Sequence, residues 1–238
     1  IRRHSYLFRA GTEVQSLFAI RSGSLKSMLM NEDGREQAMS FYLPGEVLGL
    51  DAMGGGHYVC DAVALEDSEV CKIPVAELRR LSREVPSLGH ALTCSMSCEI
   101  GRDYGVMLML GSMCAEERLA SFLLSLSRRF AARGYSASKF LLRMTRDEIG
   151  SYLGLKLETV SRVFSRFQKE AIIARKSKEI HLIDLERLNA IVQRADRRLR
   201  GSPANADAAV MINTPPSRTP AGKAAAVGLL RMPYKVTA

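Results

Sequence analysis

The chain has 238 residues, of which 47% are hydrophobic and 25% charged, so it can bury one large core or two smaller ones. No apolar run reaches the roughly 18 residues that a membrane helix requires, so we expect no membrane partner. The net charge of +9 is uneven: residues 1–127 hold 12 Lys and Arg against 16 Asp and Glu, whereas residues 128–200 hold 18 against 8. This asymmetry indicates a sensing or assembly module followed by one that binds a polyanion, with a solvated basic face as the alternative.

The cysteines and the start of the chain indicate the compartment. Five cysteines at irregular spacings argue against a disulfide framework and predict the reducing cytoplasm. We expect no signal peptide ahead of the first strand-like residues. The sequence opens at Ile1 without a methionine, and we expect further residues to precede it in the full-length protein.

Residues 1–84 are expected to form a sensory β-barrel domain, because short apolar stretches alternate there with glycine-containing turns such as "RSGS", "NEDG" and "LPGE". The period then lengthens, and residues 85–113 are expected to form a dimerisation helix. Six residues recur at steps of three or four, close to a heptad seam, and form the expected dimer interface: Leu92, Met96, Ile100, Asp103, Met107 and Leu110.

Asp103 is the acidic member of this seam. A two-fold dimer brings equivalent seam residues together, so two Asp103 carboxylates would repel each other and make the dimer marginal. In the alternative interpretation Asp103 points off the seam to water or pairs with Arg102 or another nearby arginine.

Residues 114–196 are expected to form a winged helix-turn-helix DNA-binding domain. Thr145 and Glu148 make a capping box that predicts a helix from Arg146, and Gly154 permits a tight turn after it. Asp184 is placed to cap a last helix that runs through Arg194. The Ala-, Pro- and Ser-rich residues 197–238 are expected to form a disordered tail.

The second helix of this motif has an apolar stripe and a polar face. The stripe consists of Leu157, Val160, Val163, Phe164 and Phe167. Glu158, Ser161 and Arg162 lie near the helix start on the polar face, where such a helix contacts base edges in the major groove. The residues expected near phosphates are Arg166, Lys169, Arg175 and Lys176, the last two in "AIIARKSKEIHLID", which predicts a wing-like hairpin. A helix-turn-helix that only packs is the alternative, but the basic charge and the wing favour DNA.

The stretch "MTRDEIGSYLGLKLETVSRVFSRFQK" resembles the recognition region of the Crp/Fnr superfamily, and its "E-T-V-S-R" is similar to the Fnr type. The likeness extends over roughly Leu7 to Leu188, through "LFAIRSGSLKS", "GEVLGLDAMGGGHY", "ALEDSEVCKIP" and "AEERLASFLLSLSRRF". It implies an α+β fold with a cyclic-nucleotide-binding-type β-barrel (jelly roll), a long dimerisation helix and a winged helix-turn-helix. The implied function is that of an Fnr-like transcriptional regulator that responds to oxygen or redox state through a cluster-dependent switch from monomer to dimer.

The same resemblance implies the partners. They are a second copy of the chain, RNA polymerase and double-stranded DNA with a TTGAT-like palindromic site read by Glu158, Ser161 and Arg162. The sequence departs from the Fnr pattern at Lys156, where that pattern has a threonine suited to cap the helix. Lysine lacks the capping oxygen, which costs about 1 kcal/mol of helix stability.

The effector is inferred partly from an absence in the sequence. Cyclic-nucleotide members of the superfamily hold the phosphate with an Arg-Ser or Arg-Thr pair after a "GE" turn. Here Gly45 and Glu46 are present, but the following "LDAMGGGHYVCDAVALED" contains no arginine. A phosphate without a cation or a helix N-terminus is poorly bound, so we do not expect cyclic AMP.

Fnr-type proteins instead carry a 4Fe–4S cluster on three N-terminal cysteines and one in the barrel. Cys71 in "SEVCKIP" matches the barrel ligand, and the other three ligands have no counterpart in this sequence. By residue chemistry alone, a lone cysteine in a strand is more often a small buried apolar residue. Cys94 and Cys98, one helical turn apart, are interpreted as packing residues.

Two other classes compete with this interpretation. A cupin-type enzyme would need clustered metal-binding histidines, but the four histidines are scattered and no nucleophile–base pair stands out, so we do not expect an enzyme. The second alternative keeps the DNA-binding module and takes another effector, such as haem-bound nitric oxide or a small metabolite.

Overall fold

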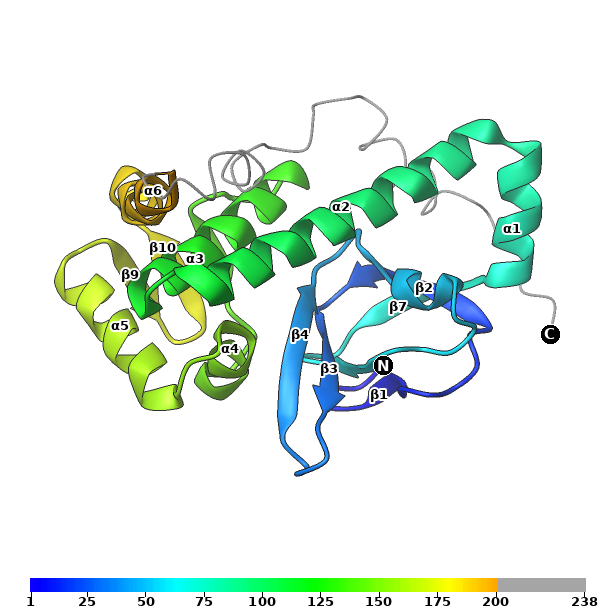
Figure 1. Ribbon diagram of the computed structural model, residues 1–238, viewed down its shortest axis with the longest axis horizontal. Coiled ribbons are helices and arrows are strands. Elements are labelled where there is room, and N and C mark those ends of the chain that lie inside the picture. The colour runs from blue at the N-terminus through cyan, green and yellow to red at the C-terminus, as the bar shows by residue number, and fades with distance from the viewer. Residues whose placement is uncertain (201–238) are drawn as a thin grey trace. The chain divides into compact units, whose positions relative to one another are not determined.

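The computed structural model describes residues 1–200, which belong to two compact units, residues 1–100 and 101–200 (Figure 1). The expected disordered tail lies, from residue 201 onward, outside the described residues. The long helix α2 begins in the first unit and ends in the second. None of the helices within residues 1–200 is both long and apolar enough to cross a bilayer.

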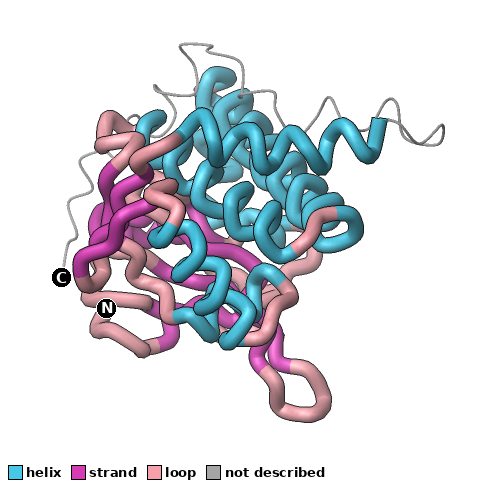
Figure 2. Tube along the Cα trace, turned by 90° about the vertical axis from the view of Figure 1, so that its left-hand side faces the viewer, coloured by secondary structure: helices cyan, strands magenta, loops and turns pink. Residues whose placement is uncertain are grey.

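The first unit is built on two antiparallel sheets. The four-stranded sheet has the order β1-β6-β3-β4, from β1 (Tyr6–Phe8), β6 (Asp61–Ala64), β3 (Leu25–Met30) and β4 (Glu36–Tyr42). The three-stranded sheet has the order β5-β2-β7, from β5 (Val47–Leu48), β2 (Ser16–Ser22) and β7 (Glu69–Pro74). The hairpin of β3 and β4 projects downward from the roll in both views (Figures 1 and 2).

These sheets make a jelly-roll-like fold rather than a closed barrel, which corrects the expectation of a barrel and confirms the jelly roll. The chain passes from one sheet to the other at Gly23 and at Gly45, whose φ angles of 86° and 84° are costly for any residue with a Cβ. At Gly23 a Cβ would also lie 2.2 Å from the hydroxyl oxygen of Ser68. The chain turns sharply at these glycines. The strands on either side of each turn belong to different sheets, and within the described residues the two sheets are not joined by backbone hydrogen bonds into one closed barrel.

Apolar side chains from both sheets fill the roll. One cluster includes Ile20, Leu25 and Leu48, and a second includes Leu17 and Leu78. The second cluster also receives three side chains from the first half of α2 (Pro86–Ser112), namely Leu88, Leu92 and Met96. Two of the six seam residues therefore pack against the core of their own chain.

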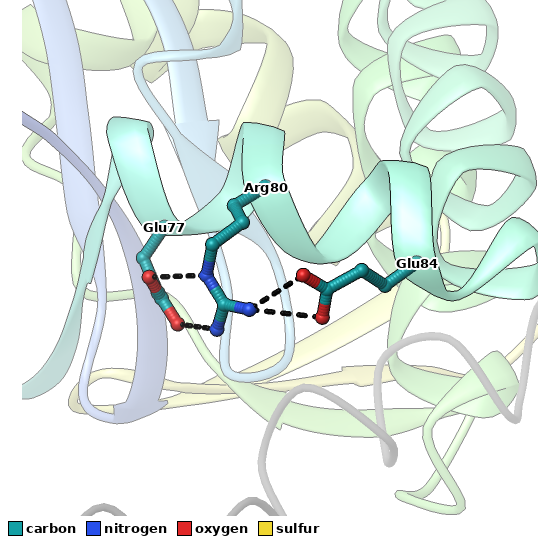
Figure 3. A network of polar contacts seen from close by, with 3 residues as sticks. All are labelled: Glu77, Arg80 and Glu84. Atoms are coloured by element: carbon teal, nitrogen blue, oxygen red, sulfur yellow. Dashed lines mark hydrogen bonds and ion pairs between the residues drawn. The ribbon is translucent and has the colours of Figure 1, made fainter.

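Helix α1 (Val75–Glu84) connects β7 to α2 and carries an exposed ion-pair network. Arg80 lies between Glu77, one turn before it, and Glu84, one turn after it (Figure 3). The pKa of Arg80 is raised by its hydrogen bonds to both carboxylates. Such pairs support a surface helix only modestly because solvent screens them.

The second unit combines four helices with a small sheet. After the end of α2 come α3 (Ala115–Ala132), β8 (Lys139–Leu141), α4 (Arg146–Leu153), α5 (Leu157–Lys169), β9 (Ile173–Lys176), β10 (Glu179–Leu182) and α6 (Leu185–Arg200). The sheet has the order β8-β10-β9, so the wing hairpin is confirmed and gains a third strand that we did not predict. Asp184 caps α6 as predicted, accepting from the Arg187 amide at 2.8 Å, but the helix extends past the predicted end at Arg194.

The helix breaks fall at Val85 and at Met113–Cys114. Functional boundaries after residues 84 and 113 stay predictions.

Candidate nucleic-acid interface

The first helix of the predicted motif starts at a fully formed capping box. The hydroxyl of Thr145 accepts from the Glu148 amide at 3.1 Å, and the Glu148 carboxylate accepts from the Thr145 amide at 2.7 Å. Both amides belong to the orphan donors of a helix start, so the pair fixes where α4 begins. The predicted start at Arg146 is confirmed.

The turn after α4 depends on two glycines. Gly154 ends the helix with φ 61° and ψ 39°, the left-handed conformation expected from its position. The backbone also passes close to Gly150, where a Cβ would lie 2.6 Å from the carbonyl oxygen of Leu155. The Leu155 amide donates to the Gly150 carbonyl at 2.9 Å, which holds the turn against α4. No turn motif in the sequence marks Gly150 for this role.

Helix α5 buries one side and exposes the other. Four of the five predicted stripe residues are buried, and Leu157 is 43% exposed, which corrects its assignment. Leu157 is the first residue of the helix and lies at its exposed end, beyond the reach of the core. The guanidinium of Arg146 lies 3.1 Å from the centroid of the buried Phe164 ring, so α4 and α5 also meet through a cation–π contact.

The exposed side of α5 carries the predicted base-reading residues. Glu158 and Arg162 are exposed, and Ser161 between them is partly exposed. The spacing of 158, 161 and 162 places all three on one face near the helix start. Within residues 1–200, the side chains of Glu158 and Arg162 make no hydrogen bond or ion pair, so their polar groups are available for another molecule.

The residues predicted to contact phosphates differ in their surroundings. Arg166 forms ion pairs with Glu116 of α3 and, at 3.5 Å, with Glu170. These ion pairs tie α5 to α3, and a phosphate contact of Arg166, whose side chain is 54% exposed, stays a prediction. Lys169 is exposed at the end of α5.

The wing presents a second basic group beside α4. Arg175 and Lys176 are exposed at the end of β9, and the Arg175 Nε atom donates to the Ser177 carbonyl at 2.7 Å. Burial lowers the pKa of Arg146 to about 10, and the positive charge of Arg175 adds to this effect. The two positive charges act on each other and together favour an anion. No motif in the sequence marks Arg146 as part of this basic group.

In the first unit, a buried carboxylate lies at the turn where the resemblance places a nucleotide phosphate. Glu46 is buried and accepts from the Leu43 amide at 2.9 Å. A negative charge at this turn is unfavourable for a phosphate group.

Cys71, the predicted cluster ligand, is partly buried in β7 opposite Ala19. The terminal amine of Ile1 donates to the Ser68 carbonyl at 2.7 Å, so the first residue lies beside the strand that carries Cys71. Within residues 1–200, no three His, Cys, Asp or Glu side chains are grouped so that they could hold a metal ion. A cluster of four ligands therefore does not fit the described residues alone.

The seam residues of α2 divide into two groups. Leu92 and Met96 pack on the core of the first unit, whereas Ile100 and Met107 are 50% and 65% exposed. Tyr104, which we did not assign to the seam, is 57% exposed. The exposed apolar face thus begins near Ile100.

Two further seam residues belong to the second unit. Leu110 is partly buried, and its Cδ2 atom would lie 3.3 Å from a Cβ at Gly154. Asp103 is exposed. Burial raises the pKa of Tyr152 in α4, and the charge of Asp103 raises it further, whereas Arg129 and Arg102 lower it. Asp103, Arg102 and Arg129 thus all act on Tyr152, and the place of Asp103 in a dimer stays a prediction.

Comparison with known proteins agrees with this geometry. The model of the Crp-like helix-turn-helix domain matches residues 117–191, and that of the cyclic nucleotide-binding domain matches residues 1–84. The fumarate and nitrate reduction regulatory protein of Escherichia coli is 47% identical over 195 residues, which cover 82% of this chain and 77% of that protein. The transcriptional regulatory protein Btr of Bordetella pertussis is 46% identical over 81% of this chain and 79% of its own length.

Among solved structures, FixK2 from Bradyrhizobium japonicum superposes with a TM-score of 0.74 at 30% identity, over 80% of this chain and 93% of that one. The two domain models, the relatives and the fold all agree with the resemblance drawn from the recognition helix. The chain is a member of the Crp/Fnr family of DNA-binding transcriptional regulators, and not an enzyme.

Proposed function

We propose that two copies of this chain bind a TTGAT-like palindromic site through α5 and thereby regulate transcription together with RNA polymerase in the cytoplasm. One observation carries the proposal: Glu158, Ser161 and Arg162 occupy the accessible face at the start of a helix that a capping box and a glycine turn hold in place. The guanidinium of arginine can donate two hydrogen bonds to guanine, at O6 and N7. A carboxylate can accept a hydrogen bond from the cytosine amino group. Arg175 and Lys176 of the wing, and Lys169, supply positive charge for the backbone.

The geometry also supports dimers. Ile100, Tyr104 and Met107 follow one another at steps of four and three along α2 and are each at least half exposed. Exposed apolar residues at this spacing are typical of a helix that packs on a second copy. A dimer would present two α5 helices to two half-sites about one helical turn apart.

The test is binding of the purified chain to fluorescent duplexes. We expect a palindromic TTGAT duplex to bind on the order of 10³ times more tightly than a scrambled duplex of equal length at physiological salt. Affinity for both duplexes should fall as salt rises from about 50 to 200 mM, because phosphate contacts release counterions. Equal affinity for the two duplexes would show that α5 reads no sequence.

We propose further that the full-length protein responds to oxygen or redox state, with Cys71 as one ligand of a 4Fe–4S cluster. This part is supported by the match of Cys71, which lies in β7, to the barrel ligand of Fnr-type proteins and by the similarity to the fumarate and nitrate reduction regulatory protein. The absence of an arginine after the turn and the buried carboxylate of Glu46 support the absence of cyclic AMP.

Absorbance of the full-length protein purified without oxygen separates the effectors. A broad visible band that disappears in air indicates a cluster, whereas a sharp Soret band indicates the alternative, haem. We expect Cys71→Ser to abolish both the band and the oxygen response, because serine rarely replaces a thiolate on iron. Cys94→Ser, which changes a residue lying 3.5 Å from a His90 ring nitrogen, is the matched control and should retain both.

A further inference from the structure

Three consecutive charged residues at the start of α3 each bind a different part of the second unit. Glu116 forms an ion pair with Arg166 of α5. Glu117 accepts from Arg198 of α6 at 2.6 Å. The third, Arg118, donates to backbone carbonyls near the ends of α2 and α4. The first turn of α3 is therefore a junction of helices.

Arg118 makes the most extensive contacts of the three. Its Nε atom donates to the Met113 carbonyl at 2.8 Å, Nη1 to Leu153 at 2.9 Å and Nη2 to Leu110 at 2.9 Å. Leu110 lies in the last turn of α2 and Leu153 is the last residue of α4, where carbonyls lack intrahelical partners and carry partial negative charge. The planar guanidinium satisfies all three carbonyls in one fixed arrangement.

The turn of the helix-turn-helix packs on the same spot. A Cβ placed on Gly154 would lie 3.3 Å from the Nη1 atom of Arg118 and 3.3 Å from the Cδ2 atom of Leu110. The turn is thus in contact with both the arginine and the last part of α2, and even a methyl group would be tight there. The contact brings together residues that are 35 and more positions apart in the chain.

The recognition helix is tied to the same turn of α3. Glu116, whose side chain is 29% exposed, holds Arg166, which lies one turn after Arg162 on α5. Helix α3 thus contacts α4 through Arg118 and α5 through Glu116. A movement of α4 relative to α2 would therefore also move α5.

We propose that Arg118 is a positioning residue that fixes the helix-turn-helix relative to the end of α2 and so determines which spacing of half-sites the dimer accepts. The inference rests on the proposed function, since it needs a dimer that binds two half-sites. Tyr104 and Met107, on the exposed face of α2, lie within two turns of Leu110. If Arg118 holds α4 rigidly on the end of α2, the dimer contact fixes the distance between the two α5 helices. If α4 can move relative to α2, each α5 can bind its half-site independently of the other.

The experiment compares the parent chain with Arg118→Ala and Arg118→Lys. Arg79→Ala is the control, because Arg79 also donates to a backbone carbonyl, that of Met53 at 3.1 Å, but does so in the first unit. Fluorescence anisotropy measures affinity for a single half-site and for palindromes whose spacer is natural or longer or shorter by one or two base pairs. Sedimentation reports the dimer, and circular dichroism reports folding.

For the parent and Arg79→Ala we expect affinity to fall about tenfold or more when the spacer changes by one base pair. Arg118→Ala should bind a half-site as the parent does, bind the natural palindrome about tenfold more weakly, and distinguish the spacers by less than about threefold. Arg118→Lys should be intermediate, because an ammonium group cannot reach three carbonyls in the same geometry. If Arg118→Ala does not fold, Arg118→Lys decides by the same criterion.

A folded, dimeric Arg118 variant that keeps the spacer preference of the parent would overturn the inference. Equal losses on half-site and palindrome with the preference retained would also overturn it, since Arg118 would then only stabilise the DNA-binding unit. A parent chain without preference for the palindrome contradicts the proposed function instead, so the two failures are distinguishable.

Discussion

The phenol of Tyr42 donates a hydrogen bond of 2.9 Å to a carboxylate oxygen of Glu99, which joins the end of β4 to α2 within the first unit. Glu99 immediately precedes Ile100, where the exposed apolar face of α2 begins. A hydrogen bond to a charged group is stronger than one between neutral groups. The contact therefore connects the jelly roll to the part of α2 that we propose to form the dimer.

We expect Tyr42→Phe to lower the free energy of unfolding by about 1.5–3 kcal/mol, because a partly buried hydrogen bond to a charged group is lost. Urea denaturation followed by circular dichroism measures the change. The control is Tyr135→Phe, which alters a tyrosine that is 56% exposed and should change stability by less than about 0.5 kcal/mol. Equal stability of the Tyr42 variant and the parent would show that the hydrogen bond contributes nothing net.

The same tyrosine predicts a response to alkaline pH. Burial raises the pKa of Tyr42 well above 10, and the charge of Glu99 raises it further. Above pH 10 the unfolded chain releases the phenolic proton while the folded chain retains it, so stability is unchanged below pH 10 and falls above it. The fall should be smaller in Tyr42→Phe, measured by denaturation between pH 9 and about 11. Parallel curves for the two proteins would contradict this assignment.

Arg162 and Lys176 should affect DNA binding differently. Arg162→Ala should cost about 1–3 kcal/mol on the specific site and relax discrimination at one guanine. Lys176→Ala should weaken all sequences alike and reduce the salt slope by about 1. Anisotropy titrations on specific and scrambled duplexes test both. An Arg162 variant that loses equal affinity for the two duplexes would exclude direct base reading by this side chain.

Lys156 is the N-cap of α5 and makes no capping hydrogen bond, as its replacement of threonine predicts. Lys156→Thr should raise the free energy of unfolding by about 1 kcal/mol, because the hydroxyl can accept from an orphan amide. It should also weaken DNA binding and lower the salt slope if the ammonium group contacts a phosphate. Lys156→Ala separates the two effects, because it removes the charge without supplying a cap. Unchanged stability of the threonine variant would argue against the capping explanation.

Asp103→Ala tests the repulsion expected on α2. If two Asp103 carboxylates face each other in a dimer, the variant should dimerise more strongly than the parent in air. If Asp103 instead interacts with the arginines around Tyr152, the variant should dimerise no more strongly than the parent. Sedimentation of both proteins without a cluster decides between the two, with Asp147→Ala on α4 as a matched loss of one carboxylate.

Short-range sequence patterns predicted the helix-turn-helix. They could not predict contacts between residues that are far apart in the sequence. Thr145 and Glu148 are three residues apart, so their capping box is visible in the sequence. Arg118 and Leu153 are 35 positions apart, and no spacing rule connects an arginine to a backbone carbonyl. Heptad spacing likewise placed Leu92 on the seam, although the side chain packs on its own unit, because periodicity marks a buried face without saying what covers it.

The buried carboxylate of Glu46 limits how the jelly roll could be re-engineered. An arginine introduced beside the turn of Gly45 would lie close to the carboxylate of Glu46, and an internal ion pair would compete with any nucleotide for the new cation. Removing Glu46 would leave the Leu43 amide without its acceptor. Control of this chain by a soluble nucleotide would therefore require several substitutions together. Each single substitution would lower stability without creating a nucleotide site.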